Sequence, residues 1–166
     1  IVTLQGRVSD SSPAMAAMIS MRLLVVRRKP ADRVRAVGDN RYGQLGNGED
    51  TWSPRRVLLP ADDPPVIAVS GKLVHSLALK SDGTAWGWGY NNVGQVGNGT
   101  TTNHTFLAQI PNLAGVTAIA ARMYHSLALK SDGLVWGWGW NEDGQLGDGT
   151  TMNRSAPVQV TGITGA

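Results

Sequence analysis

Hydrophobic and polar positions alternate along two stretches of the chain that have nearly the same sequence. HSLALK followed by TAWGWGY lies within residues 75–90, and HSLALK followed by LVWGWGW lies within residues 125–140. Because strict alternation is typical of a half-buried strand, each stretch predicts two β-strands. Ser-Asp-Gly separates the two strands in both cases, and Asp-Gly supplies the positive φ angles that a tight turn needs. We therefore predict two β-hairpins.

Each predicted hairpin is flanked by two further apolar runs. Runs rich in β-branched residues precede the hairpins at Pro65–Gly71 and Gly115–Arg122, and the runs FLAQI and APVQV follow them. Each set of about 50 residues therefore predicts four strands. No apolar period of 3.6 residues occurs in residues 38–166, so a helical solenoid is not expected. The sequence predicts an all-β protein.

The two sets of strands are copies of one repeat. Residues 72–101 align with residues 122–151 without a gap, and residues 38–48 align with residues 89–99. We interpret residues 22–37 as a decayed form of the same strand pair, in which arginine and valine replace tryptophan. A four-stranded unit that recurs at this period, with Gly and Trp at fixed places, predicts the blades of a β-propeller.

The repeat divides the chain into three units. The predicted boundaries assign residues 22–70 to a degenerate first unit, residues 71–121 to the second unit and residues 122–166 to the third unit. Residues 1–21 match no part of the repeat and are left unassigned.

The alternation of tryptophan with glycine predicts packing between blades. Successive side chains of a strand point to opposite faces, so the tryptophans share one face and the glycines leave the other face bare. We expect large side chains of one blade to fill the space that glycines leave on the next. The residues assigned to these structural repeat positions are His75, His125, Trp86, Trp88, Trp136, Trp138, Gly87, Gly89, Gly137 and Gly139.

Three other aromatic residues are candidates for contact with a ligand or partner. Tyr42, Tyr90 and Trp140 precede or open the loops that contain Gly-Gln. The ends of blade strands lie at a rim, where a partner can reach them.

Charge and composition exclude several classes of function. Ten of the fifteen basic residues lie in the first 56 positions, so the net charge of +3 does not describe a basic surface over the whole chain, and nucleic-acid binding is not expected. The chain has no cysteine, which excludes thiolate chemistry. The apolar run at residues 14–26 is too short to span a bilayer and has no signal-peptide pattern. The compartment is left open, with the cytoplasm favoured.

No residues of the sequence predict an enzyme. The chain has three histidines, and His75 and His125 occupy equivalent repeat positions, which places them in different blades and not in one cluster; His104 is the third. Three carboxylates between residues 142 and 148 could suggest a calcium loop, but the equivalent loop NNVGQVGNG has none. We therefore expect no catalytic residue, no metal site and no cofactor.

The repeat resembles a known family. HSLALKSDG, WGWG, N-x-x-G-Q-[LV]-G-[ND]-G-T-T and APVQV look like the repeats of the regulator of chromosome condensation family. The resemblance covers residues 38–166 well and Arg22 to Val37 weakly, and the TTMNRSAPVQV wording is closer to the bacterial branch. It implies a seven-bladed propeller, of which three units are present. We expect this chain to be a fragment, and self-association or a partner that completes the ring are the alternatives.

The resemblance also implies that the chain acts by binding through loops on one face of a propeller. We therefore predict a non-enzymatic scaffold for a protein partner. Two alternatives stay open. One is a regulator of a small GTPase that acts like a guanine-nucleotide exchange factor, although no inserted hairpin between repeats is visible. The other is a carbohydrate-binding propeller that uses its rim aromatics.

Overall fold

The computed structural model describes residues 40–46, 48 and 64–163 with their side chains, and four short strands before residue 57 by their backbone. The strands are β1 (Val2–Thr3), β2 (Arg22–Val26), β3 (Arg33–Val37), β4 (Arg55–Arg56), β5 (Val66–Lys72), β6 (His75–Lys80), β7 (Ala85–Gly89), β8 (His104–Gln109), β9 (Val116–Ala121), β10 (His125–Lys130), β11 (Val135–Gly139) and β12 (Arg154–Gln159). Over these described ranges, no helix is long and apolar enough to cross a membrane.

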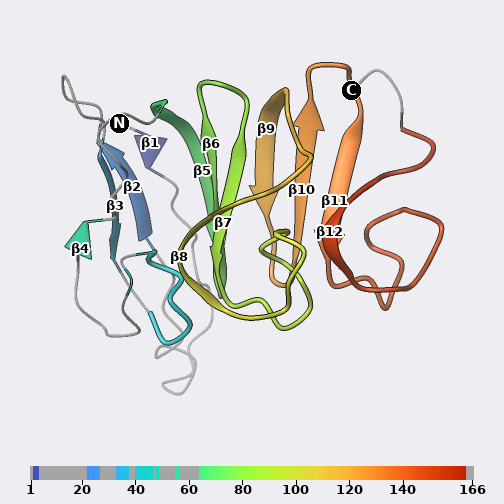
Figure 1. Ribbon diagram of the computed structural model, residues 1–166, viewed down its shortest axis with the longest axis horizontal. Helices are drawn as coiled ribbons and strands as arrows, with labels where there is room; N and C mark the ends of the chain where they lie inside the picture. Colours follow the sequence, from blue (N-terminus) through green and yellow to red (C-terminus); the bar gives the residue numbers. More distant parts are fainter. Residues whose placement is uncertain are drawn as a thin grey trace.

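The strands form three antiparallel sheets that stand side by side (Figure 1). The sheets have the orders β1-β2-β3-β4, β5-β6-β7-β8 and β9-β10-β11-β12, so each is a blade of four consecutive strands. The all-β prediction and the four strands per repeat are confirmed. The strand pair predicted within residues 22–37 is present as β2 and β3, with Val25 opposite Val34.

The blades begin earlier in the chain than the predicted units. The second and third sheets start at Val66 and Val116, whereas the sequence division starts these units at residues 71 and 122. In the first sheet, β1 pairs with β2 through Val2 opposite Val25, so the segment left unassigned supplies a strand to the first blade. In the second and third blades the motif HSLALK forms the second strand, and the sequence alignment starts just before it, at residues 72 and 122.

The hairpin turns differ from the predicted type. Lys80 N donates to Thr84 O at 3.0 Å and Gly83 N donates to Lys80 O at 3.0 Å, which closes a loop of three residues. Gly83 has a φ of 78°, and Asp82 is not among the residues with positive φ. A three-residue loop needs only one positive φ, because a type I turn leads into a glycine bulge. Asp82 instead caps the turn by accepting from Thr84 N at 2.9 Å.

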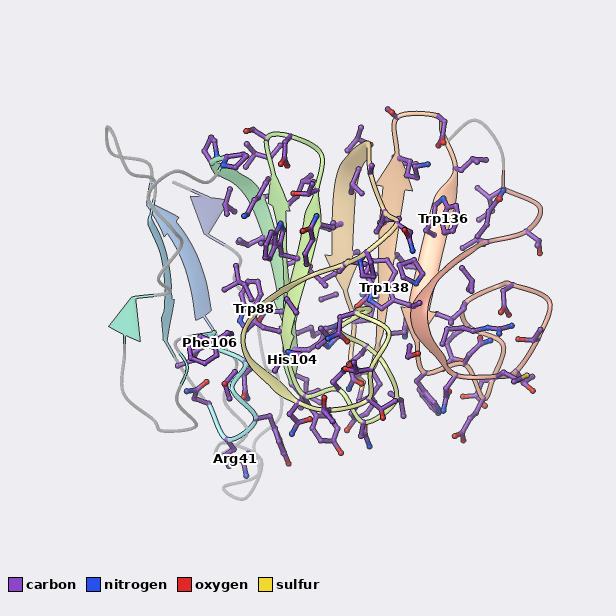
Figure 2. All side chains as sticks on the ribbon, in the orientation of Figure 1. Arg41, Trp88, His104, Phe106, Trp136 and Trp138 are labelled. Atoms are coloured by element: carbon purple, nitrogen blue, oxygen red, sulfur yellow. The ribbon has the colours of Figure 1, made fainter. Side chains whose placement is uncertain are left out.

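Two fully buried tryptophans of the repeat pack between adjacent blades. Trp88 packs with Leu45 of the first unit, and Trp138 packs with Leu77 and Leu79 of the second. Both indoles have an exposed fraction of 0%, and Figure 2 shows them at corresponding places on successive sheets. Removal of such a side chain typically costs about 3 to 5 kcal/mol.

Trp86 and Trp136 lie two residues before these tryptophans on the same strands and are partly buried. Lys80 Nζ lies 3.8 Å from the centroid of the Trp86 ring, and Trp86 Nε1 donates to Thr84 Oγ1 at 3.1 Å. In the third blade, Lys130 Nζ lies 5.6 Å from the Trp136 ring, and Trp136 Nε1 is buried without an acceptor in the described part of the chain.

The glycines that make room for the buried indoles are in the loops and not in the strands. A Cβ at Gly97 would lie 2.5 Å from Trp138 Nε1, and one at Gly46 would lie 2.7 Å from Trp88 Nε1. A Cβ at the strand residue Gly87 would instead lie 2.6 Å from Val96 O of its own blade. The bare face of the strand is therefore covered by the loop that follows it. The same loop contains Gly97, which makes room for the indole of the next blade.

The remaining strand glycines of the repeat have similar local roles. Gly89 and Gly139 end their strands with φ of 107° and 100°, against the backbone of the preceding turn. A Cβ at Gly137 would lie 3.2 Å from Leu127 and 3.3 Å from Leu146, both in its own blade.

We call the interface between two adjacent blades a joint. At each described joint, one backbone carbonyl oxygen of a loop accepts two hydrogen bonds from the next blade. Gln44 O accepts Trp88 Nε1 at 2.8 Å and Ser76 Oγ at 2.9 Å. Gln95 O accepts Trp138 Nε1 and Ser126 Oγ, both at 2.9 Å. The second joint therefore repeats the hydrogen bonds of the first, and it holds the two loops at the same place on successive blades.

Candidate functional site

The loops that follow the third strands gather at one end of the blades. Because His75 lies opposite Gly89 and His125 opposite Gly139, the turns that precede HSLALK share this end with the loops. Figure 1 shows the loops after β7 and β11 at the lower end of the sheets. We call this end the loop face, and it comprises residues 40–46, 72–74, 90–103, 122–124 and 140–153.

An asparagine side chain holds each loop in shape. Asn91 Oδ1 accepts Val96 N at 2.8 Å, and its Nδ2 donates to Thr100 O and Thr102 O at 3.0 Å each. Asn141 makes the same set of bonds within the third unit. A buried side chain that satisfies several backbone groups fixes the loop around it, so the exposed residues between these bonds are presented on a firm support.

Four partly exposed aromatic side chains form two pairs on the loop face. The ring centroids of Tyr42 and Tyr90 are 4.6 Å apart at 51°, and this pair joins the first unit to the second. The rings of Tyr124 and Trp140 are 6.3 Å apart and meet edge to face at 89°. Such distances are typical of attractive aromatic pairs. The structure thus brings Tyr42 and Tyr90 together and places Trp140 in a separate pair.

Tyr124 is a member of the site that the sequence reasoning missed. Its equivalent in the second unit is Val74, which is buried, so the repeat gave no reason to expect an aromatic residue there. The one available signal was the position itself, since residue 124 directly precedes the motif HSLALK and must lie at the same end as Trp140.

Two exposed cations occupy equivalent places on the loop face. Lys72 ends β5 and Arg122 follows β9, and no ion pair joins either side chain to another described residue. Burial, followed by the charge of Arg122, lowers the pKa of His125 below its usual value. Arg122 therefore favours a neutral imidazole beside it.

Charge at the loop tips changes from one blade to the next. The exposed equivalent positions are Arg41 in the first loop, Asn92 in the second and Glu142 in the third. Figure 2 shows Arg41 at the lower end of the first loop. In the third loop Asp148 is tied down, since Arg154 Nη2 lies 2.7 Å from its Oδ2. The tip position is therefore basic in the first loop, neutral in the second and acidic in the third.

His75 and His104 make side-chain hydrogen bonds within the described part of the chain. His75 Nε2 lies 2.8 Å from Ser126 Oγ, and since Ser126 already donates to Gln95 O, the imidazole is the donor. Burial, followed by the nearby charge of His125, lowers the pKa of His75 to about 3. His104 Nε2 lies 2.6 Å from Asn98 Nδ2 in the second loop.

The part of the chain described with side chains holds no group of three His, Cys, Asp or Glu residues that could bind a metal ion.

Comparison with known proteins identifies the repeat. A model for the regulator of chromosome condensation (RCC1) repeat matches residues 82–129 and 132–166. A second model with the same description matches residues 66–95 and 116–145.

Two curated relatives have clear sequence similarity. The ultraviolet-B receptor UVR8 of Arabidopsis thaliana is 39% identical over 75 residues, which cover 44% of this chain and 17% of the receptor. The regulator of chromosome condensation of Drosophila melanogaster is 32% identical over 98 residues, which cover 58% of this chain and 18% of that protein. The chain thus spans less than a fifth of the length of these relatives.

Two solved structures have the same fold. Prp20p of Saccharomyces cerevisiae matches with a TM-score of 0.74 and 21% identity, over 85% of this chain and 36% of the yeast chain. Human WBSCR16 matches with a TM-score of 0.67 and 24% identity, over 86% of this chain and 38% of the human chain.

Proposed function

Because the chain belongs to the regulator of chromosome condensation repeat family, we propose that it is a protein-interaction module that binds a protein partner through its loop face. The observation that carries the proposal is the pair of aromatic contacts, Tyr42 with Tyr90 and Tyr124 with Trp140, held partly exposed on firm loops. Aromatic residues and arginine are enriched in the centres of protein interfaces.

The exposure of these aromatics separates them from the structural tryptophans. Trp88 and Trp138 are fully buried and donate to backbone carbonyls, whereas Trp140 is partly exposed at the end of its strand. A rigid, amphipathic ring loses little conformational entropy when a partner covers it. Trp140 and Tyr90 are therefore suited to binding in a way that the buried indoles are not.

Lys72 and Arg122 indicate the chemistry of the partner. Both are exposed at equivalent places beside the aromatic pairs. Complementary charge across an interface steers association and fixes its orientation. We propose that the partner presents acidic side chains to these cations.

Known relatives support a protein partner. The structure of Prp20p was described with its binding to Gsp1p and histones, and a second structure shows Kap60 bound to yeast RCC1. These partners belong to the yeast proteins. For the present chain they support the proposal that the partner is a protein. His75 is buried and neutral, which supports binding without catalysis.

The test compares wild-type chain with Trp140→Ala and with the double variant Lys72→Glu, Arg122→Glu. The immobilised proteins capture partners from a cell extract, the captured proteins are identified by mass spectrometry, and their affinities are then measured by calorimetry with purified partner. We expect Trp140→Ala to weaken binding by about 2 kcal/mol, as for an interface hot spot. Its Tm should stay close to that of the wild-type chain.

The matched control is Trp138→Ala, which removes a buried indole two residues away on the same strand and should lower the Tm sharply. Equal capture by wild-type chain and by both loop-face variants would refute the proposal. Binding of a glycan array that depends on Trp140 would favour the carbohydrate alternative instead.

A further inference from the structure

Tyr42 and Tyr90 meet across the joint between the first and second blades. Tyr42 lies in the loop of the first unit, and Tyr90 directly follows β7 in the second. Their ring centroids are 4.6 Å apart, and the ring planes are tilted by 51°. Two rings joined directly by a carbon–carbon bond have centroids about three bond lengths apart, or roughly 4.5 Å. The two side chains are therefore as close as a covalent link between their rings requires.

The backbone holds both tyrosines in place. Tyr42 N donates to Gln44 Oε1, and Tyr90 N donates to Val74 O, both at 2.9 Å. A Cβ at Gly89 would lie 3.2 Å from Gln44 Cα, so the two backbone segments that carry the rings run against each other. Groups that a protein holds in contact react far faster than groups that must first meet by diffusion. The joint therefore favours a reaction between these two rings.

The tyrosine pair is specific to the first joint. Solvent reaches both Tyr42 and Tyr90, because each is only partly buried. Tyr124 is the remaining tyrosine of the chain, and it pairs with Trp140 at 6.3 Å. The second joint has valine and tryptophan at the positions equivalent to Tyr42 and Tyr90. Among the described residues, a close pair of tyrosines thus occurs at the first joint and not at the second.

We propose that Tyr42 and Tyr90 are the site of an oxidative crosslink, in which a peroxidase with hydrogen peroxide joins the two rings as dityrosine. Each phenol loses one electron and one proton to give a tyrosyl radical. The two radicals form a carbon–carbon bond between the ring carbons next to each oxygen. The hydrogens of these carbons then move to the oxygens, which restores both hydroxyls. The two electrons and two protons reduce one hydrogen peroxide to two water molecules.

The crosslink supplies a covalent tie that cysteine cannot give this chain, since it has no cysteine. It joins the loop of the first unit to the end of a strand in the second. Without the link, this joint depends on the hydrogen bonds to Gln44 O and on the buried Trp88. A crosslink between residues far apart in sequence restricts the unfolded chain and so stabilises the folded one. Oxidation therefore tightens the first joint.

The test treats the purified chain with a haem peroxidase and hydrogen peroxide at several protein concentrations. We expect a monomeric product that shows the blue fluorescence of dityrosine. Mass spectrometry should find one crosslinked peptide pair, containing residues 42 and 90, that lacks two hydrogen atoms. The linked fraction should not depend on protein concentration, because the reaction occurs within one chain. No partner is present, so the outcome is independent of the protein-binding role proposed for the loop face.

Matched variants keep the rings and remove the reactive hydroxyls. Tyr42→Phe and Tyr90→Phe should each lower the yield of dityrosine by about tenfold or more, while the Tm of the unoxidised chain stays nearly unchanged. Tyr124→Phe should leave the yield unchanged. In urea, where the joint is unfolded, the link between residues 42 and 90 should also fall by about tenfold or more. Oxidation of free tyrosine in the same urea solution controls for the activity of the peroxidase.

The proposal is overturned if the oxidised monomer carries no link between residues 42 and 90. It is also overturned if dityrosine forms only in crosslinked dimers. An equal yield of the link in urea would show that the native contact is not its cause, and loss of the link in Tyr124→Phe would show that another tyrosine is required. Either result refutes the assignment.

Discussion

Acidification should weaken the joint between the second and third blades through His75. Burial, followed by the nearby charge of His125, holds the pKa of His75 at about 3, whereas an imidazole in an unfolded chain has a pKa of about 6.5. Between these values the unfolded chain binds a proton that the folded chain does not bind. The contribution of neutral His75 to the free energy of unfolding is therefore fully present above about pH 6.5. It is lost progressively as the pH decreases toward 3.

The structure gives a reason for the low pKa and a size for the effect. His75 Nε2 already donates to Ser126, and His75 Nδ1 is buried with no partner in the described part of the chain. Protonation would place both a charge and an unsatisfied donor between the blades. At about 1.4 kcal/mol for each pH unit below 6.5, the loss at pH 5 is about 2 kcal/mol, a large share of the stability of a typical domain.

Urea unfolding followed by tryptophan fluorescence at pH 7.5, 6 and 5 measures this loss. The pKa values of Asp82 and Asp132 are also lowered, chiefly by hydrogen bonds from residue 84 and residue 134, but carboxylates titrate below this range. The matched variant His75→Gln keeps an N–H donor near the position of Nε2 and removes the titrating group, so its stability should depend much less on pH. A wild-type chain whose free energy of unfolding is unchanged between pH 7.5 and 5, or a variant with the same slope, would refute the reasoning.

Three further predictions test the packing. Gly97→Ala should lower the free energy of unfolding by about 2 to 5 kcal/mol, because its Cβ would meet an indole and φ is +84°. Gly99→Ala, with a similar φ of +87° and open space, should cost only about 1 to 2 kcal/mol in the same urea titration. Leu134→Thr should raise the Tm by giving the buried Trp136 Nε1 an acceptor worth about 1 kcal/mol, and Thr84→Leu in the second blade should lower it.

The sequence predicted the parts of the fold that depend on side-chain periodicity. The alternation of apolar residues and the internal repeat predicted the hairpins of HSLALK with WGWG. They also predicted the strands on either side of these hairpins. The alignment set the second and third units to begin at residues 71 and 122, because the preceding strand varies more between the copies, although their sheets begin at Val66 and Val116.

The parts that the sequence did not predict depend on backbone groups. Gln44 and Gln95 act at the joints through their carbonyl oxygens, and a carbonyl has no sequence signature of its own. From the alternation of Trp and Gly within one strand, we expected the indoles of one blade to pack against the strand glycines of the next. This expectation missed the loop that folds back over Gly87 and brings Gly97 to the next blade, since that contact joins residues about 40 positions apart.

The internal repeat also separates residues that build the ring from residues that choose a partner. Serine and tryptophan recur at the second and third blades because each must satisfy a carbonyl with the same geometry. The loop tips carry Arg41, Asn92 and Glu142 at equivalent exposed positions. The two described joints hold the first and second loops at the same place on successive blades. If the loop face binds a partner, as we propose, substitutions at its tips change the recognised surface without changing the support beneath it.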